Sequence, residues 1–177
     1  MRDFGLRHLF RILAGVSQTA PYRHFTNKEA LLAAVAEDGF RAMAAGISQA
    51  MATSGGSPLE RLRAVGLGYV SFATSHPSHF RVMFGREMAD RAAYPSLREV
   101  AAGIFRVLHD TIADCQRAGL VRSGEPQDLA LAAWSTVHGL SALLVDGYPA
   151  EALASPAEML ADRVTRDLFL GLGRSLT

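Results

Sequence analysis

Apolar residues recur at steps of three and four along most of the chain, and this spacing is typical of amphipathic helices. The clearest example begins near Thr26 and continues through a series of apolar positions: Leu32, Val35, Phe40, Met43, Ile47 and Met51. No convincing run of alternating apolar and polar residues, which would predict a strand, accompanies it. The pattern predicts an all-α fold.

Helix starts are marked by three capping boxes, in which a hydroxyl precedes a Glu by three residues. These hydroxyls belong to Thr26, Ser57 and Ser155, and Pro58 and Pro156 stand at the expected first helical positions. The chain is predicted to contain seven or so helices, and the short ones of its basic start lie before residue 26. The other helices are predicted at about 26–52, 58–75, 77–84, 95–118, 126–145 and 156–172.

Composition indicates an ordinary globular chain, because 49% of its 177 residues are hydrophobic and can bury a core. The most apolar window, 129–147, contains Ser, Thr, His and Gly, which favours a buried helix over a membrane span. Basic residues interrupt the apolar start of the chain, which argues against a secretory signal. Cys115 is the single cysteine and forms no internal disulfide. We expect a cytoplasmic protein that does not associate with a membrane.

Charge is distributed unevenly along the sequence. Residues 1–28 carry five bases against one acid, a net +4, whereas residues 29–177 carry 13 bases against 16 acids, a net −3. A basic head on a mildly acidic body is typical of a head that meets a polyanion, although a short basic terminus is often only a solvated surface.

The stretch AGVSQTAPYRHFTNKEALL, residues 14–32, predicts a helix-turn-helix motif. Ser17 is a good N-cap for a short helix over 18–24, Gly15 provides a tight turn, and the segment before it can form another helix. Polar residues at such a helix N-terminus can approach base edges, while Tyr, His and Lys side chains can donate to phosphates. Taken singly, Tyr22 and Phe25 are also compatible with a core, and Arg23 and Lys28 with a solvated surface.

Residues 14–40, AGVSQTAPYRHFTNKEALLAAVAEDGF, resemble the recognition-helix region of the TetR family of bacterial transcriptional regulators. The resemblance implies that Gln18, Thr19 and Ala20 face base edges of double-stranded DNA and that Tyr22, His24 and Lys28 hold phosphates. With the cap and the adjacent base, the implied DNA-binding residues are Ser17, Gln18, Thr19, Ala20, Tyr22, Arg23, His24 and Lys28.

The start departs from the family pattern. Only 13 residues precede Ala14, and Arg11 stands where a buried Ala is expected. The first helix of the head is therefore expected to be missing or remodelled. We predict a DNA-binding head with its connecting helix over 1–52 and an effector-binding and dimerisation domain over 53–177.

A second resemblance covers the body. WSTVHG, beginning at Trp134, and HPSHFRVMFG, residues 76–85, are similar to the TetR subgroup named after its Trp-His-Gly pattern. This implies a helical domain that binds a small-molecule effector and forms a homodimer through its last two long helices. An apolar stripe in the last helix, from Met159 to Leu172, needs a partner inside the subunit or across a twofold axis, and the resemblance favours the axis.

Aromatic and Met side chains on several helices form the candidate effector site, although each of them is also a normal core residue. The scarcity of charge predicts a neutral or weakly polar effector. The candidate ligand-binding residues are Phe72, Phe80, Met83, Phe84, Met88, Phe105, Trp134 and His138.

Catalytic and metal sites receive no support from the sequence. His76 and His79 form H-x-x-H without a further ligand cluster, and a loop at a helix start explains them. Another polar group lies along one helix but lacks a matched base and nucleophile: His109, Asp110, Asp114 and Cys115. We expect no enzyme, cofactor or metal.

Together these features predict a ligand-responsive regulator of the TetR type, a repressor released from a palindromic operator by a small apolar effector. The alternative is a dimeric small-molecule-binding or interaction module that has lost DNA binding because its first helix is missing. A third hypothesis, a helical enzyme, requires turnover to be shown.

Overall fold

Helices make up all the regular structure in the part of the chain that the computed structural model describes, residues 25–86, 91–147 and 155–172. The all-α prediction is confirmed. The helices are α2 (Lys28–Thr53), α3 (Pro58–Ser75), α4 (Pro77–Phe84), the short 3-10 helix η2 (Arg91–Ala93), α5 (Pro95–Arg117), α6 (Pro126–Asp146) and α7 (Ala157–Leu172).

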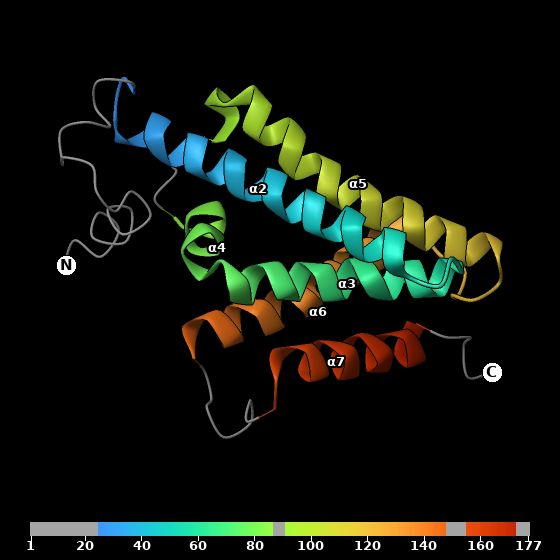
Figure 1. Cartoon of the computed structure of the whole chain (residues 1–177). Helices are drawn as coiled ribbons and strands as arrows, with labels where there is room; N and C mark the ends of the chain where they lie inside the picture. The colour runs from blue at the N-terminus through green and yellow to red at the C-terminus, as the bar shows by residue number, and fades with distance from the viewer. Residues whose placement is uncertain (1–24, 87–90, 148–154, 173–177) are drawn as a thin grey trace.

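Helix α3 lies at the centre of the bundle (Figure 1) and contacts α2, α4, α5, α6 and α7. Two glycines allow close packing around it. A Cβ atom on Gly68 of α3 would lie only 3.1 Å from the Cα of Ile47 of α2, and one on Gly39 would lie 2.6 Å from the sulfur of Met83 of α4. Gly39 therefore makes room for α4 against α2, beyond its cost to helix propensity.

The structure confirms one of the three predicted capping boxes and differs from the prediction at the other two. The box at α3 is confirmed, because the Ser57 hydroxyl accepts from the amide of Glu60 at 3.2 Å and the Glu60 carboxylate accepts from the amide of Ser57 at 3.1 Å. The prediction for α2 is wrong by one residue: Asn27, not Thr26, is the N-cap, and its side chain accepts from the amide of Ala30 at 2.8 Å. An Asn is at least as good a cap as a Thr, so the helix begins where the Asn carbonyl can be used.

The last predicted box also differs, because α7 begins at Ala157 and Pro156 precedes the helix. Ser155 is then too far upstream to be the capping residue, and its hydroxyl accepts instead from Arg163 at 3.4 Å.

Helix α5 ends at Arg117, within one residue of the predicted end, and Gly119 follows it closely. Gly119 has a φ of +68°, and its amide donates to the carbonyl of Gln116, while the amide of Leu120 donates to the carbonyl of Cys115. These two bonds form a Schellman motif, which needs a left-handed residue and so favours glycine.

Helix α6 is the one helix in the described part of the chain that is long and apolar enough to cross a membrane. It packs against α3, α5 and α7 and buries Leu129, Ala133 and Val137, as the core helix of a bundle does. Length and composition alone are therefore weak evidence for a membrane span.

Candidate ligand cavity

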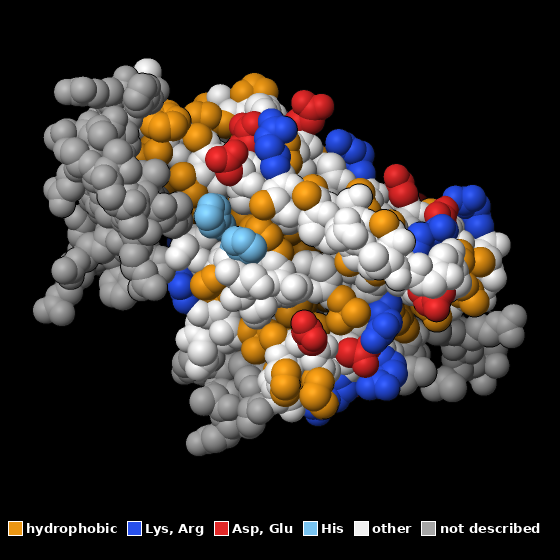
Figure 2. Space-filling model, viewed as in Figure 1, with side chains coloured by type: hydrophobic (Ala, Val, Ile, Leu, Met, Phe, Trp, Pro, Cys, Tyr) orange, Lys and Arg blue, Asp and Glu red, His pale blue; other side chains and the backbone are white. Residues whose placement is uncertain are grey.

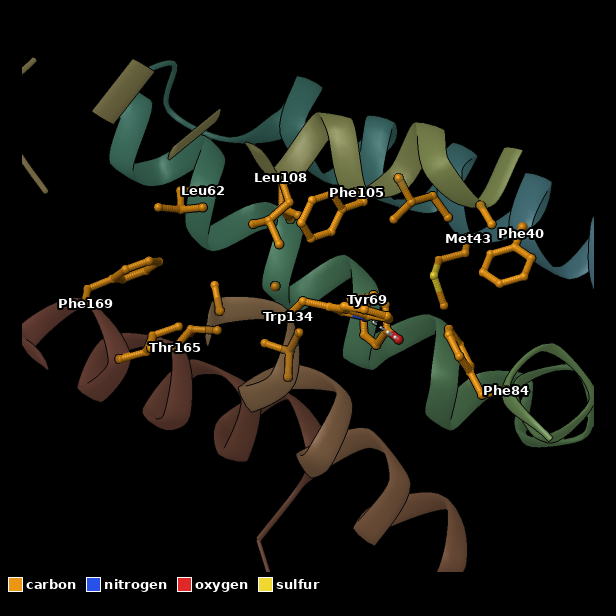
Figure 3. Close-up of a pocket in the computed structure, with 17 residues that line it drawn as sticks. Phe40, Met43, Leu62, Tyr69, Phe84, Phe105, Leu108, Trp134, Thr165 and Phe169 are labelled. Carbon is orange, nitrogen blue, oxygen red and sulfur yellow. Dashed lines mark hydrogen bonds between the residues drawn. The ribbon is translucent and has the colours of Figure 1, made fainter. Parts of the chain in front are cut away.

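A cavity of about 180 Å³ lies in the middle of the bundle (Figure 3). Its wall takes side chains from each of the described α-helices, from Phe40 and Met43 on α2 to Leu168 and Phe169 on α7. The wall residues of α2 and α3 are buried, whereas several of those on α5, α6 and α7 are half-buried. The described residues of the wall are Phe40, Met43, Leu62, Val65, Gly66, Tyr69, Phe84, Ala101, Ile104, Phe105, Leu108, Ala133, Trp134, Val137, Thr165, Leu168 and Phe169.

Only three of these wall residues carry a hydrogen-bonding side chain, and all three are satisfied within the protein. The indole nitrogen of Trp134 donates to the Tyr69 oxygen at 3.2 Å, and that hydroxyl lies 2.8 Å from Nδ1 of His138. The hydroxyl of Thr165 donates to the carbonyl of Ala161 at 2.7 Å. The wall contains no charged residue. It therefore offers an apolar surface to whatever fills it.

The direction of the Trp134–Tyr69–His138 chain follows from its chemistry. An indole N–H can only donate, so the Tyr69 oxygen accepts from Trp134 and its own proton goes to His138. Burial lowers the pKa of His138 and raises the pKa of Tyr69, so both side chains are neutral near pH 7. His138 then accepts at Nδ1 and carries its proton on Nε2.

Aromatic side chains of α4 pack against these hydrogen-bonded residues. The ring of Phe84 lies 4.6 Å from that of His138 and 5.5 Å from that of Phe40, both nearly edge to face. Phe80 lies 5.4 Å from His138 and 6.2 Å from Tyr69. Such edge contacts add to the energy of burial and fix the orientation of the rings.

A second, open hollow of about 810 Å³ lies between α2, α3 and α7. Its wall includes the ion pair of Arg63 with Asp162 at 2.5 Å and several hydroxyl groups. Acidic and basic side chains are intermingled on the face drawn in Figure 2. This groove is polar and open, so the apolar cavity within the bundle is the better candidate for a ligand site.

Comparison with known proteins decides the family. The family model for the tetracyclin repressor-like C-terminal domain matches residues 62–168, more than half of the chain. The chain belongs to the TetR family. This match contains α4, α5 and α6 in full and most of α3 and α7, and so includes nearly all of the cavity wall.

Solved structures agree with the TetR fold. A protein of unknown function from Rhodococcus sp. RHA1 is 30% identical, with a TM-score of 0.77, and the match covers 96% of this chain and 84% of that one. The TetR family transcriptional regulator PfmR from Thermus thermophilus is 19% identical, with a TM-score of 0.74 and coverage of 96% and 89%. A bacterial regulatory protein of the TetR family from Rhodococcus RHA1 is 20% identical, with a TM-score of 0.74 and coverage of 96% and 86%. No curated protein sequence matches the chain.

The structure brings three of the expected ligand-binding residues of this TetR protein to the cavity: Phe84, Phe105 and Trp134. Phe80, Met83 and His138 lie behind the wall, and His138 reaches it only through Tyr69. Phe72 lies elsewhere, in the wall of the open groove, and its ring stacks on His76 at 4.8 Å. Met88 lies outside the described residues.

Sequence reasoning missed the contributions of α2 and α7 to the cavity, among them Phe40, Met43, Leu168 and Phe169. Each of these residues belongs to an apolar stripe that the sequence shows. Such a stripe does not reveal which of its residues pack in the core and which line a cavity. The stripe of α7 also faces mainly inward, because Leu160 is buried and Leu168 and Phe169 pack on the core. Among its large side chains Met159 is the exception, at 60% exposed.

Of the expected DNA-binding residues, Lys28 is described by the structure. It is exposed in the first turn of α2, directly after the Asn27 cap. Phe25 is half-buried and packs on the core, as expected of a core aromatic. The other members of the set, Ser17, Gln18, Thr19, Ala20, Tyr22, Arg23 and His24, lie outside the described residues.

The polar groups considered for catalysis do not form a catalytic arrangement in the described chain. The rings of His76 and His79 are 6.1 Å apart, and no cluster of three His, Cys, Asp or Glu residues suited to a metal occurs there. Cys115 is buried, and burial raises the pKa of its thiol, so it is held as the weakly nucleophilic neutral form. The TetR fold points to a regulator and not to an enzyme.

Proposed function

We propose that this TetR protein is a ligand-responsive transcriptional regulator, a cytoplasmic repressor that a small apolar effector releases from a palindromic operator. The observation that carries the proposal is the apolar cavity within the body of a TetR fold. Such a cavity, walled by apolar and aromatic side chains and lacking charge, is the usual form of a small-molecule site.

The head supplies the contact with DNA in this proposal. Residues 1–28 carry a net charge of +4, and the sequence of 17–24 predicts a capped helix start with polar side chains suited to base edges. The exposed Lys28 side chain at the start of α2 is placed to contribute a phosphate contact. We retain residues 1–52 as head plus connecting helix and 53–177 as effector-binding and dimerisation domain.

We assign the dimer interface to α6 and α7, and α6 provides most of it. Leu131, Ser135, Gly139 and Leu143 recur every four residues along α6 and are all exposed. A Cβ atom on Gly139 would meet nothing within 4 Å, so the helix surface is open there. Small residues between two leucines allow a second copy of the helix to approach closely. A twofold dimer would present its recognition helices to successive major grooves, about 34–36 Å apart.

Helix α2 connects the cavity to the head. Phe40 and Met43 line the cavity, and Lys28 lies on the same helix about 18 Å away at 1.5 Å per residue. An effector that binds more tightly to one position of α2 than to another shifts the population toward that position and changes the separation of the heads.

The test is binding of the 177-residue chain to DNA upstream of its own gene, followed by fluorescence anisotropy at two salt concentrations with unrelated competitor DNA. We expect specific binding that weakens with salt, is lost in Tyr22→Ala, and has a salt slope lower by about one in Lys28→Ala. Arg122→Ala, which removes an exposed charge from the α5–α6 connection, is the matched control and should leave binding unchanged.

Two results would count against this function. A folded dimer that shows no specific DNA binding would favour the alternative, a small-molecule-binding or interaction module without DNA binding. Specific DNA binding that no cavity ligand alters would retain the regulator but remove effector release.

A further inference from the structure

The cavity is longer than it is wide. Gly68 of α3 packs against Ile47 of α2, and a short loop joins the two helices so that they run in opposite directions (Figure 1). Phe40 lies seven residues from this point toward one end of the bundle, and Leu62 lies six residues from it toward the other. At 1.5 Å per residue the backbones of these two wall residues are about 20 Å apart along the bundle.

A compact hollow does not fit this separation. A sphere of about 180 Å³ would be only about 7 Å across. The side chains of Phe40 and Leu62 fill part of this separation, and the wall residues Met43 and Val65 lie between them along the bundle. Figure 3 shows the same elongation, with Phe169 and Leu62 toward one end of the wall and Phe40 and Phe84 toward the other. The volume is therefore spread along a narrow slot.

The part of the wall nearest to solvent comes from α4, α5, α6 and α7. The wall residues of α2 and α3 are buried, whereas Phe84, Phe105, Trp134 and Phe169 are half-buried. A ligand that entered between these aromatic rings would extend toward a deep wall whose described residues offer no free hydrogen-bonding side chain.

We propose that the cavity binds an unbranched aliphatic chain of about six carbons, inserted tail first, with any polar head group left at the entrance. This proposal rests on the proposed effector function and names the chemical class of the effector. A methylene fills roughly the volume of one liquid water, about 30 Å³, so 180 Å³ holds about six of them. A polar group placed on the inserted tail would lose its water and find no partner, because Tyr69, Trp134 and Thr165 already bond within the protein.

The chain carries its own reporter for this test, since Trp134 is its single Trp and lines the slot. Probes are straight-chain 1-alkanols from butanol to decanol, the seven-carbon ring compound cyclohexylmethanol, and 1,6-hexanediol. Trp134 fluorescence and titration calorimetry measure their binding to the full chain.

We expect affinity to rise about fourfold with each added methylene up to about six carbons and to level off beyond that length. Cyclohexylmethanol should bind at least about tenfold more weakly than 1-heptanol, and 1,6-hexanediol at least about tenfold more weakly than 1-hexanol. Ring and chain alcohols of equal affinity, or a diol that matches its mono-alcohol, would overturn the aliphatic-chain proposal while leaving an effector cavity in place. Absence of binding by every probe would overturn the cavity as a ligand site and with it the proposed effector response.

A pair of variants on α5 localises the binding. Ala101→Leu adds bulk to a half-buried wall residue, whereas Ala102→Leu adds the same bulk to an exposed neighbour. Ala101→Leu should shorten the alcohol at which affinity levels off and reduce 1-hexanol affinity at least about tenfold, and Ala102→Leu should change neither. Thermal unfolding of both variants confirms that they are folded. Equal alcohol binding by two folded variants would place the alcohols outside the slot and overturn the proposal.

Discussion

Tyr69 connects the cavity wall to His138, because its hydroxyl both accepts from Trp134 and donates to His138. Without these two partners the hydroxyl would be an unpaired group on the wall, at a cost of about 1–3 kcal/mol. The indole of Trp134 is held by the same bond, with its ring edge to face against Phe105 at 6.1 Å. One hydroxyl therefore determines both how apolar the cavity is and how the Trp that borders it is oriented.

This arrangement makes the stability of the fold depend on pH. Burial lowers the pKa of His138, so the native state holds the imidazole neutral, whereas the unfolded chain takes up a proton near pH 6.5. A group with a lowered native pKa contributes stability above its unfolded value, and that stability is lost as the pH falls below about 6.5. Protonation would also remove the acceptor of Tyr69. We expect the urea midpoint to decrease between about pH 7 and pH 5.

The matched variant is His138→Asn, which retains an acceptor near the Nδ1 position and does not titrate. Its urea midpoint should depend less on pH than that of the unaltered chain. Some dependence remains, because burial also lowers the pKa of His79. If the urea midpoints of the two proteins depend equally on pH, the pKa of His138 does not differ between the native and the unfolded state.

Residue identity alone does not reveal the cavity. The sequence predicts that Phe84, Phe105 and Trp134 belong to an apolar interior, and the structure brings these three to the wall. Phe80 and Met83 are equally apolar but pack into the core, since the turn of α4 directs them toward α3 and α2. A cavity is a place where packing fails to fill space, and this depends on the relative positions of several helices, which no local pattern encodes.

At the scale of elements, local patterns were sufficient. The helices predicted over 26–172 agree with the structure to within one or two residues, because caps, prolines and periodicity act over a single turn. Ser57 and Ser155 show the limit of this approach, since both precede Pro-x-Glu and only Ser57 caps a helix. In the second case the Ser155 hydroxyl accepts from Arg163, a contact that the local pattern does not predict.

Two glycines in neighbouring helices should respond to substitution with opposite signs. Gly68→Ala places a Cβ atom 3.1 Å from the backbone of Ile47, which cannot move without separating α2 from α3. Gly46→Ala meets nothing within 4 Å. We expect Gly46→Ala to raise the free energy of unfolding by about 0.5–1 kcal/mol, and Gly68→Ala to lower it despite the same gain in helix propensity.

Urea unfolding monitored by far-UV circular dichroism measures both changes, and Gly46→Ala is the control for propensity. Stabilisation by both substitutions would mean that the α2–α3 contact can widen at little cost, and that Gly68 does not set the spacing of the bundle.

At the scale of the whole molecule, the proposed function requires two copies of the chain at a fixed separation. The cavity lies inside one subunit, but a palindromic operator needs two heads at a fixed separation. The surface available for this purpose is the outer face of α6, where Leu131 is 51% and Leu143 42% exposed, together with Met159 of α7 at 60%. Among the described side chains of α7, the charged residues Arg163, Arg166 and Asp167 are also exposed.

Replacing both Leu131 and Leu143 with Glu should convert the dimer to a monomer, because four buried carboxylates would face one another across the twofold axis. Sedimentation or light scattering measures the change in mass. Val107→Glu on α5 is the control, since Val107 is a comparably exposed apolar residue, at 37%, outside the proposed interface.

The monomer should retain its helical content and its cavity, so alcohols should still change Trp134 fluorescence. It should lose high-affinity operator binding, because a single head contacts only one half-site. A double variant that remains dimeric would place the twofold axis on another face of the bundle, and one that is monomeric yet binds the operator unchanged would show that dimerisation does not set operator affinity.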